Sequence, residues 1–429
     1  MSPETFRLNR RSFLVGSVLF AGGAALAGCT SDPLNKNAGA ASGAKVTLQQ
    51  WYHAYGESGT QQAVQRYAQE FTKANPDIAI NVSWIAGDYE TKLNSAMLTA
   101  QAPDLFELGD FRYQNVKNGL LAPLDDVVGP AKADFSPAAL DTVTVEGKIY
   151  GVKMIDDVMM LYYRKSALQA AGVQPPQTFA ELLDATKRLN TGKQKGLYVG
   201  TDGVGEAATL LLWSSGADFF DSSGKKVAFS SPEAVAAIAG LKQLHDTGGL
   251  LQGYPTDWSD PGAFANGATA MQWGGLWSLP DIKKALGDDF GIVAWPKFGD
   301  AGKQVARVGG WYQLANAKSQ NLDAAKKFID WLWIKNADLQ KDWCVKYGFH
   351  IPARKPVAAQ TTEFSSGPAK DAVTISQQNG KSYSGLWNKA SATLFLQAAT
   401  KIANGQADPA AELADAAKKA QAEVDKQLA

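Results

Sequence analysis

The sequence predicts an α/β protein in which doubly wound parallel sheets are covered by helices on both faces, with two or three domains. Strand-like and helix-like periodicities alternate from Lys45 onward, and clear helix-start signals separate them. The chain has 429 residues, which is long for one domain at roughly 150 residues each. Its hydrophobic content of 45% and charged content of 20% are typical of a globular protein.

The N-terminal part of this pattern has a β-α-β-α-β order. The expected elements are a strand at 46–51, a helix at 61–74, a strand at 78–84, a helix capped by Asp88 and a strand at 105–108. This order favours a parallel sheet, because each helix returns the chain to the same edge. Ligands bind beyond the carboxyl ends of such strands, so the loops at 52–57, 87–89 and 107–110 are candidate binding loops.

The later elements follow from local signals. We expect a turn at 148–151, a continuous apolar strand at 158–163, a capping box from Thr178 to Glu181 and a helix started by Ser231-Pro232. A helix at 321–335 carries Trp333 on its apolar face, so that ring is expected in a core. An alanine-rich helix follows Asp408-Pro409.

The N-terminus predicts export and lipid anchoring. Arg7, Arg10 and Arg11 precede an apolar run that is too short for a permanent transmembrane helix, and residues 9–14 resemble a twin-arginine signal. Residues 26–29 then resemble a bacterial lipobox in which Cys29 is lipidated. We therefore expect a signal peptide at 1–28 and a flexible tether at 29–44, with the body of the protein held at the membrane by Cys29.

Composition excludes several function classes. With 42 basic and 42 acidic residues the net charge is zero, which gives no basic footprint for nucleic acid. Three scattered histidines cannot form the usual metal motifs, so no metal and no cofactor is expected. After Cys29 only Cys344 remains, so no intrachain disulfide is expected. We expect a monomer.

The stretch from Asp257 to Pro280 is typical of a surface that holds a ligand. Trp258, Trp273 and Trp277 stand among glycines with few acid–base groups. Such rings offer apolar faces, and the glycines allow close approach of a ligand. The alternative is that these tryptophans fill a core, because Trp is usually highly buried.

The order of several segments resembles a known family. These segments are FTKANPDIAINVSW, DYETKLNSAMLTAQAPDLFEL, GLLAPLDD, KIYGVK, LYYRKSALQAAGVQPPQTFAEL, FANGATAMQWGGLW and AAKKFIDWLW. Together they are similar to family 1 of the extracellular solute-binding proteins, the maltose-binding-protein-like carbohydrate receptors of ABC importers. The resemblance covers the chain from Lys45 onward. It is their order that carries the resemblance, because no single segment is diagnostic.

The resemblance implies a fold and a function. It implies a periplasmic-binding-protein-like fold (type II): two α/β lobes joined by hinge strands, which close on a carbohydrate ligand and deliver it to ABC permease subunits. The first lobe would be 45–154 plus about 312–352, and the second 155–311 plus about 353–429. The receptor would capture a neutral mono- or oligosaccharide.

The resemblance also implies acidic site residues. Asp110 has the spacing to Gly119 at which the maltose receptor's pattern places a sugar-binding aspartate, although Phe111 stands where that pattern has arginine and Arg112 follows one position later. Asp157 matches a ligand-contacting acid. Its neighbour Asp156 would point to the opposite side of the strand, so only one of the two can face the cleft.

Aromatic rings complete the predicted site. Trp277 and Trp387 match family positions, and Trp311 lies at an expected lobe crossing; Trp258 is interpreted as structural. The further candidates are Tyr52, His53 and Glu57, in the loop after the first strand, and Trp213 and Trp273.

Two other functions stay open on the residues alone. One is a receptor for a polyamine or a polyol phosphate, although the six arginines left after the signal peptide are not clustered. The other is a secreted glycoside hydrolase with Asp110 and Asp157 as its carboxylates. The GxGxxA pattern at 203–208 is interpreted as chance.

Overall fold

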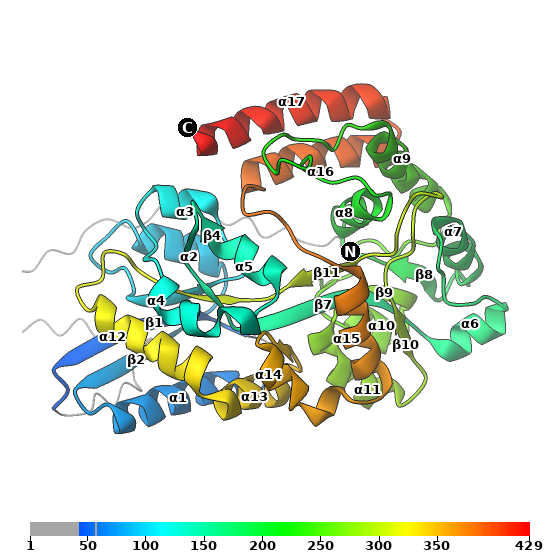
Figure 1. Cartoon of the computed structure of the whole chain (residues 1–429). Helices are drawn as coiled ribbons and strands as arrows, with labels where there is room; N and C mark the ends of the chain where they lie inside the picture. The colour runs from blue at the N-terminus through cyan, green and yellow to red at the C-terminus, as the bar shows by residue number, and fades with distance from the viewer. Residues whose placement is uncertain (1–42, 56–57) are drawn as a thin grey trace, which may run out of the picture. The chain divides into compact units, whose positions relative to one another are not determined.

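The computed structural model describes residues 43–55 and 58–429. The predicted signal peptide at 1–28, Cys29, most of the tether and Glu57 lie outside the described residues. Within the described chain two main β-sheets carry the fold, and each is covered by helices (Figure 1). We call the parts built on these sheets the first lobe and the second lobe.

The sheet of the first lobe has the strand order β2-β1-β3-β12-β6. β1 is parallel to β2 and β3, as the β-α-β-α-β pattern predicts, because α1 and α2 return the chain between them. β12 runs antiparallel to both β3 and β6. The strands and linking helices are β1 (Val46–His53), α1 (Thr60–Ala74), β2 (Ile78–Ile85), α2 (Tyr89–Ala96), β3 (Leu105–Leu108), β6 (Val152–Lys153) and β12 (Tyr312–Ala315).

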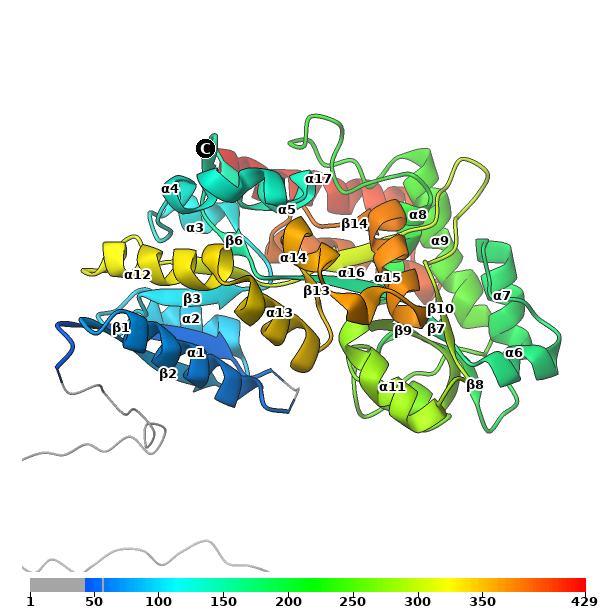
Figure 2. The same cartoon turned by 60° about the horizontal axis from the view of Figure 1, so that its bottom comes forward.

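Short elements and a C-terminal return segment complete the first lobe. They are α3 (Tyr113–Lys117), α4 (Asp125–Val128), η1 (Gly129–Asp134), α5 (Pro137–Val143), β4 (Thr144–Val145), β5 (Lys148–Ile149), α12 (Leu322–Ile329), the π-helical η3 (Asp330–Lys335) and α13 (Ala337–Lys346). Although far apart in sequence, α13 lies beside α1 (Figures 1 and 2), where the Tyr67 hydroxyl donates to Asp342 at 2.7 Å.

The prediction of one turn in this lobe is wrong. Residues 148–151 were expected to turn, but Lys148 and Ile149 form β5, which pairs with β4. The turn is made by Glu146 and Gly147, whose φ angles are 50° and 78°. Glycine adopts this left-handed region freely, so the second position of the turn carries no steric penalty.

The sheet of the second lobe has the order β14-β11-β7-β9-β8 and contains antiparallel pairs that the sequence pattern did not predict. β7 is antiparallel to β9, β10 and β11, whereas β8 and β9 are parallel. The strands are β7 (Ile155–Tyr163), β8 (Lys195–Tyr198), β9 (Thr269–Gly275), β10 (Gly291–Val293), β11 (Ala306–Gly309), β13 (Ile351–Pro352), which pairs with the start of β7, and β14 (Gly380–Lys381).

The antiparallel pairing follows from how the chain crosses between the sheets. β7 enters the second lobe directly after β6, with Met154 between them, and β11 leaves toward β12 through Gly310-Trp311. Strands that enter and leave one lobe side by side must run in opposite directions. Gly310 has φ 127°, and a Cβ there would lie 2.0 Å from the Ile155 carbonyl oxygen, so this crossing requires glycine.

Helices cover the second sheet, and their predicted caps form. Thr178 and Glu181 make the capping box, Ser231 accepts from Ala234 N–H at 3.3 Å, and Asp408 accepts from Ala411 N–H at 2.9 Å. The helices are α6 (Lys165–Ala171), α7 (Phe179–Arg188), α8 (Gly205–Ser214), α9 (Pro232–Asp246), α10 (Gly262–Ala265), η2 (Leu276–Ser278), α11 (Leu279–Leu286), α14 (Lys355–Ala359), η4 (Thr362–Phe364), α15 (Gly367–Asn379), α16 (Lys389–Ala403) and α17 (Pro409–Leu428).

The buried apolar side chains fall into separate cores. One core draws on residues 48–155 and 312–353 and includes Trp333, as the periodicity of its helix predicts. The second lobe holds a large core between 159 and 424 and a smaller one that includes Val158 and Tyr162 of β7. Exact lobe boundaries stay a prediction.

Candidate functional site

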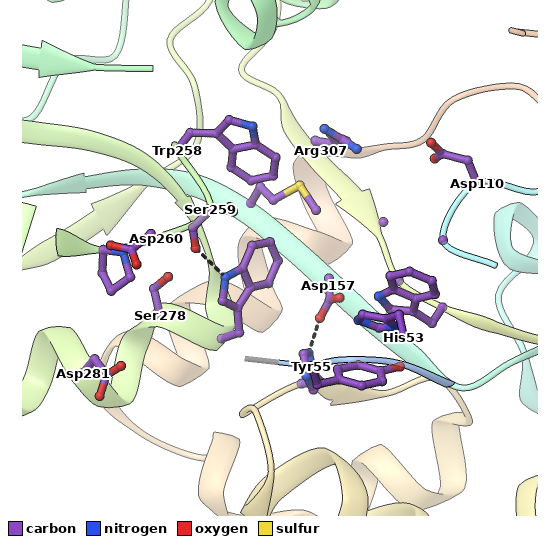
Figure 3. Close-up of a pocket in the computed structure, with 18 of the residues that line it drawn as sticks. His53, Tyr55, Asp110, Asp157, Trp258, Ser259, Asp260, Ser278, Asp281 and Arg307 are labelled. Carbon is purple, nitrogen blue, oxygen red and sulfur yellow. Dashed lines mark hydrogen bonds and ion pairs between the residues drawn. The ribbon is translucent and has the colours of Figure 1, made fainter. Parts of the chain in front are cut away.

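A cavity of about 670 Å³ lies where the ends of both sheets meet the crossing strands (Figure 3). Strand ends, the connections between strands and the loop before α10 all contribute to its wall. The lining residues are His53, Tyr55, Glu90, Gly109, Asp110, Asp157, Met159, Trp258, Ser259, Asp260, Pro261, Trp277, Ser278, Asp281, Arg307, Gly309, Gly310, Trp311 and His350.

The second lobe contributes a pair of tryptophans to this wall. The ring centroids of Trp258 and Trp277 are 6.0 Å apart at 58°, and Trp277 Nε1 donates to the Ser259 carbonyl oxygen at 2.9 Å. A Cβ on Gly275 would lie 2.1 Å from the Trp277 ring. Only glycine at this strand end therefore lets the Trp277 ring fold back over the backbone.

The first lobe contributes a stack of three rings. The His53 ring is 3.7 Å from the Trp311 ring at 15° and 3.7 Å from the Tyr55 ring at 41°, by centroids. Below them the fully buried Glu107 of β3 accepts a hydrogen bond from the Tyr55 hydroxyl at 2.7 Å. Burial, and then the nearby Glu107 carboxylate, raise the pKa of Tyr55 well above its usual range.

Asp156 and Asp157 point to opposite faces of β7. Asp157 lines the cavity and hydrogen-bonds His350 Nδ1 (Figure 3), whereas Asp156 pairs with Lys153 at 2.5 Å on the other face. That face lines a separate cavity of about 460 Å³. The alternation of a strand explains this, because successive side chains point to opposite sides.

Charge in the cavity is mostly negative. Its carboxylates belong to Glu90, Asp110, Asp157, Asp260 and Asp281. Arg307 also lines it, but its guanidinium pairs with Glu206 at 2.8 Å and lies 5.6 Å from the Trp258 ring centroid. Burial on its own lowers the pKa of Arg307, but Glu206 and other neighbours reverse this and raise it above its usual value.

A second chamber of about 380 Å³ continues the cavity and shares Glu90, Asp110 and Arg307 with it. Trp387 lines this chamber, and its ring stacks on Phe219 at 4.0 Å and 26°. The predicted residues His53, Asp110, Asp157, Trp277, Trp311 and Trp387 are therefore brought together along one continuous surface.

Three predicted residues do not reach this surface. Tyr52, Trp213 and Trp273 are 1%, 2% and 0% exposed. Tyr52 packs against Trp84 and Trp343 on the face of β1 opposite His53, and Trp273 lies edge-on to Trp295 in the large core. Trp213 Nε1 donates to Asp218 at 3.0 Å. Their rings are enclosed by core side chains, so we withdraw them as ligand contacts. Glu57 lies outside the described residues.

Sequence reasoning missed several residues of the cavity. Trp258, expected to be structural, lines the cavity, as do Tyr55, Ser278 and Arg307. Tyr55 follows His53 by two residues in a candidate loop, which was a usable signal. Glu107 was visible as a lone charge inside the apolar strand LFEL. No pattern in the sequence indicated Arg307.

The described residues carry no group of three or more His, Cys, Asp or Glu side chains that could hold a metal ion. No helix among residues 43–55 and 58–429 is long and apolar enough to cross a membrane. The side chains that line the cavity offer aromatic contact, carboxylate and imidazole hydrogen bonding, and one paired guanidinium.

Comparison with known sequences supports a receptor. The family model for bacterial extracellular solute-binding proteins matches residues 66–372. The sn-glycerol-3-phosphate-binding periplasmic proteins of Escherichia coli K12 and of Salmonella typhimurium LT2 are each 27% identical to this chain over 366 residues, covering 78% of this chain and 81% of their own length.

Solved structures confirm the predicted two-lobed fold. An ABC transporter solute-binding protein of Thermotoga lettingae, bound with α-D-tagatose, superposes with a TM-score of 0.74 at 21% identity, covering 88% of this chain and 99% of that one. The GacH receptor of Streptomyces glaucescens gives 0.73 at 24% identity, covering 89% and 98%. Maltose-bound MalE3 of T. maritima gives 0.71 at 21% identity, covering 88% and 99%.

The family model spans most of the chain, and members of this family bind solutes for transporters. This family match also confirms the prediction that the chain is not an enzyme. The chain therefore belongs to the bacterial extracellular solute-binding proteins, the receptors of ABC importers.

Proposed function

We propose that the receptor captures a neutral mono- or oligosaccharide in the cavity and delivers it to an ABC permease. The observation that carries this proposal is the composition of the wall. Aromatic rings from both lobes, among them Trp277, Trp258 and Trp311, face the same space as Asp110, Asp157 and Asp281.

A sugar matches both kinds of group. The C–H faces of a pyranose pack against aromatic rings. Its hydroxyls lose their water in the cavity, and each then needs a replacement partner. Carboxylates such as Asp110 accept hydrogen bonds from two hydroxyls at once.

The charges of the wall argue against an anionic ligand. The arginines among the described residues that line the two chambers are Arg307, which pairs with Glu206 at 2.8 Å, and Arg112, which pairs with Glu90 at 2.6 Å. A phosphate monoester would face Glu90, Asp110 and Asp157 with no unpaired guanidinium to bind it. Glycerol phosphate, which the E. coli relative is named for binding, stays a second candidate because Arg307 does line the cavity.

A polyamine is a weaker match because most of the carboxylates have partners. Asp157 pairs with His350, Glu90 pairs with Arg112 at 2.6 Å, and Asp260 accepts from the Gly262 N–H at 2.7 Å. Hydrogen bonding of these carboxylates reduces the negative potential that a polycation needs.

The residues that we propose to contact the sugar are the predicted ones that line the two chambers, together with Tyr55 and Trp258. The set is His53, Tyr55, Asp110, Asp157, Trp258, Trp277, Trp311 and Trp387. We expect the lobes to close about the crossing strands when the ligand binds.

Isothermal titration calorimetry tests the ligand class. The panel contains common mono- and disaccharides, maltotriose, glycerol 3-phosphate and spermidine. We expect at least one neutral sugar to bind with a micromolar or lower Kd, about −8 kcal/mol or more favourable. A clear signal for glycerol 3-phosphate or spermidine, with no heat from any sugar, contradicts the proposal.

We also propose that a twin-arginine signal exports the chain and that lipidated Cys29 tethers it as a monomer. Labelled palmitate should be incorporated into the wild-type protein and not into Cys29→Ser, which should appear in the medium or periplasm. Incorporation of label into both proteins excludes Cys29 as the lipidation site.

A further inference from the structure

His53 lines the cavity, but neighbouring groups cover most of its side chain, which is 18% exposed. One face of the ring stacks on Trp311 at 3.7 Å and 15°, and the tilted Tyr55 ring packs against it with centroids also 3.7 Å apart. His53 Nδ1 lies 2.5 Å from Glu107 Oε1. With Nδ1 held by Glu107, Nε2 is the ring nitrogen left to meet a ligand in the cavity that His53 lines (Figure 3).

Glu107 is placed to control the His53 ring. The residue is 0% exposed, and its side chain accepts from His53 N–H at 2.8 Å and from the Tyr55 hydroxyl at 2.7 Å in addition to the His53 ring. The Tyr89 hydroxyl donates to the Glu107 backbone carbonyl at 2.9 Å and fixes the strand beside it. One buried carboxylate therefore holds both the backbone and the rings of the first-lobe stack.

We propose that Glu107 is a positioning residue that keeps the proton of neutral His53 on Nδ1, so that Nε2 presents a lone pair to a hydroxyl of the ligand. The Glu107 carboxylate already accepts from the His53 N–H and the Tyr55 hydroxyl, and it lies 2.5 Å from Nδ1, so Nδ1 is the nitrogen placed to donate to it. The part of this inference that concerns the ligand rests on the sugar-receptor function proposed above.

This arrangement selects the type of oxygen at one position of the ligand. A hydroxyl can donate to Nε2, whereas a methoxy group or a ring oxygen cannot. Glu107 itself never contacts the ligand. It acts through the proton of His53. A substitution at Glu107 should therefore affect ligand binding by changing the tautomer of His53.

Nitrogen-15 NMR of the ligand-free protein, labelled at histidine, tests the tautomer without any ligand. The chain has three histidines, and His53→Phe identifies the signal of His53. We expect a protonated Nδ1 and an unprotonated Nε2 at pH 8. In Glu107→Met, whose thioether is only a weak acceptor, the tautomers should mix, while Glu107→Gln should keep most of the wild-type signal because its amide oxygen still accepts.

Asp342→Asn is the matched control. Asp342 is also a largely buried carboxylate of the first lobe and also accepts from a tyrosine hydroxyl, at 2.7 Å, but it does not line the cavity. This variant should leave the His53 signal unchanged. A wild-type His53 protonated on Nε2 alone, or the same His53 spectrum in Glu107→Met and wild type, overturns the inference.

Calorimetry with a sugar that binds the wild-type protein tests the second step. We expect Glu107→Met and His53→Phe each to weaken binding about 10-fold, and the double variant to be no weaker than either, since both remove the same contact. Glu107→Gln should stay within about threefold of wild type. Near-ultraviolet circular dichroism identifies variants that fail to fold. If Glu107→Met is one of them, the wild-type tautomer and the affinity of His53→Phe carry the test: Nε2 protonation in wild type, or wild-type affinity of His53→Phe, overturns the inference.

The sugar-receptor function and the positioning role of Glu107 are contradicted by different results. If no sugar binds but the tautomer is as expected, the proposed function is wrong and the positioning role of Glu107 is retained. If a sugar binds equally well to wild type and folded Glu107→Met, the inference is wrong and the receptor function is retained.

Discussion

The two walls of the cavity hold their rings by different means. In the second lobe Trp277 is fixed by a close backbone approach at Gly275 and by one hydrogen bond to the Ser259 carbonyl oxygen. In the first lobe His53 and Tyr55 are fixed by the buried carboxylate of Glu107. One wall therefore depends on shape and the other on hydrogen bonds to a buried carboxylate, so substitutions should affect the two walls differently.

The largest expected effect distinguishes Trp277, which lines the cavity, from Trp273, which lies in the core and stands four residues earlier in the chain. Trp277→Ala should weaken sugar binding about 100-fold, because a large ring face is lost from the cavity, with little change in thermal stability. Trp273→Ala should instead lower the free energy of unfolding by about 3–5 kcal/mol, since Trp273 is fully buried. Calorimetry and chemical denaturation measure the two effects. Equal losses of stability would place Trp277 in the core.

A second pair of variants tests whether shape alone holds the second-lobe wall. Gly275→Ala should weaken sugar binding about 10-fold, because a Cβ 2.1 Å from the Trp277 ring must displace it. Gly274→Ala is the control, since its Cβ would lie 3.5 Å from Tyr162, an ordinary van der Waals contact. Similar sugar affinities of the two variants would show that the Trp277 ring keeps its position in the cavity wall without a glycine at position 275.

The first-lobe wall should respond to alkali. Burial and the Glu107 carboxylate raise the pKa values of Tyr52, Tyr55 and Tyr89 in the folded chain. Unfolded tyrosines ionise near pH 10, so above that pH the unfolded state binds fewer protons than the folded state and stability falls as pH rises. Below pH 10 this contribution is fully present.

Tyr55→Phe isolates one of these groups. Urea denaturation between pH 8 and pH 11 should show a slope that is shallower than wild type by up to about 1.4 kcal/mol per pH unit above pH 10. At pH 8 the variant should also lose about 1 kcal/mol, since the hydrogen bond to Glu107 is gone. An unchanged slope means that Tyr55 already ionises in the folded protein.

The same contrast explains how much could be predicted from the sequence. Periodicity and caps identified β1, α1, β2 and α17 because those signals are local. Trp277 and Asp157 were identified by resemblance. Tertiary placement was not predictable: Trp258 and Trp273 stand in the same glycine-rich stretch, yet one lines the cavity and the other fills the core. Arg307 reaches the cavity only because β11 pairs with β7, which no local pattern indicates.

The smallest expected effect concerns Ser278, which precedes α11 in the second-lobe wall. Its side chain is 3% exposed, and its Oγ has no hydrogen-bond partner within the part of the chain that the structure describes. A buried hydroxyl without a partner destabilises the free protein, and a ligand hydroxyl that supplies the partner gains affinity from it.

Ser278→Ala should therefore leave stability unchanged or slightly raised while it weakens sugar binding about three- to tenfold. Ser382→Ala is the contrast, because the Ser382 hydroxyl in the second chamber already donates to the Val308 carbonyl at 2.6 Å. That variant should lose about 1 kcal/mol of stability. Thermal denaturation measures the stability of the two variants, and calorimetry measures their affinity for the sugar. If Ser278→Ala is destabilised and binds the sugar as well as wild type does, Ser278 Oγ stabilises the folded protein and does not contact the ligand. The second-lobe wall then makes no polar contact with the ligand at this position.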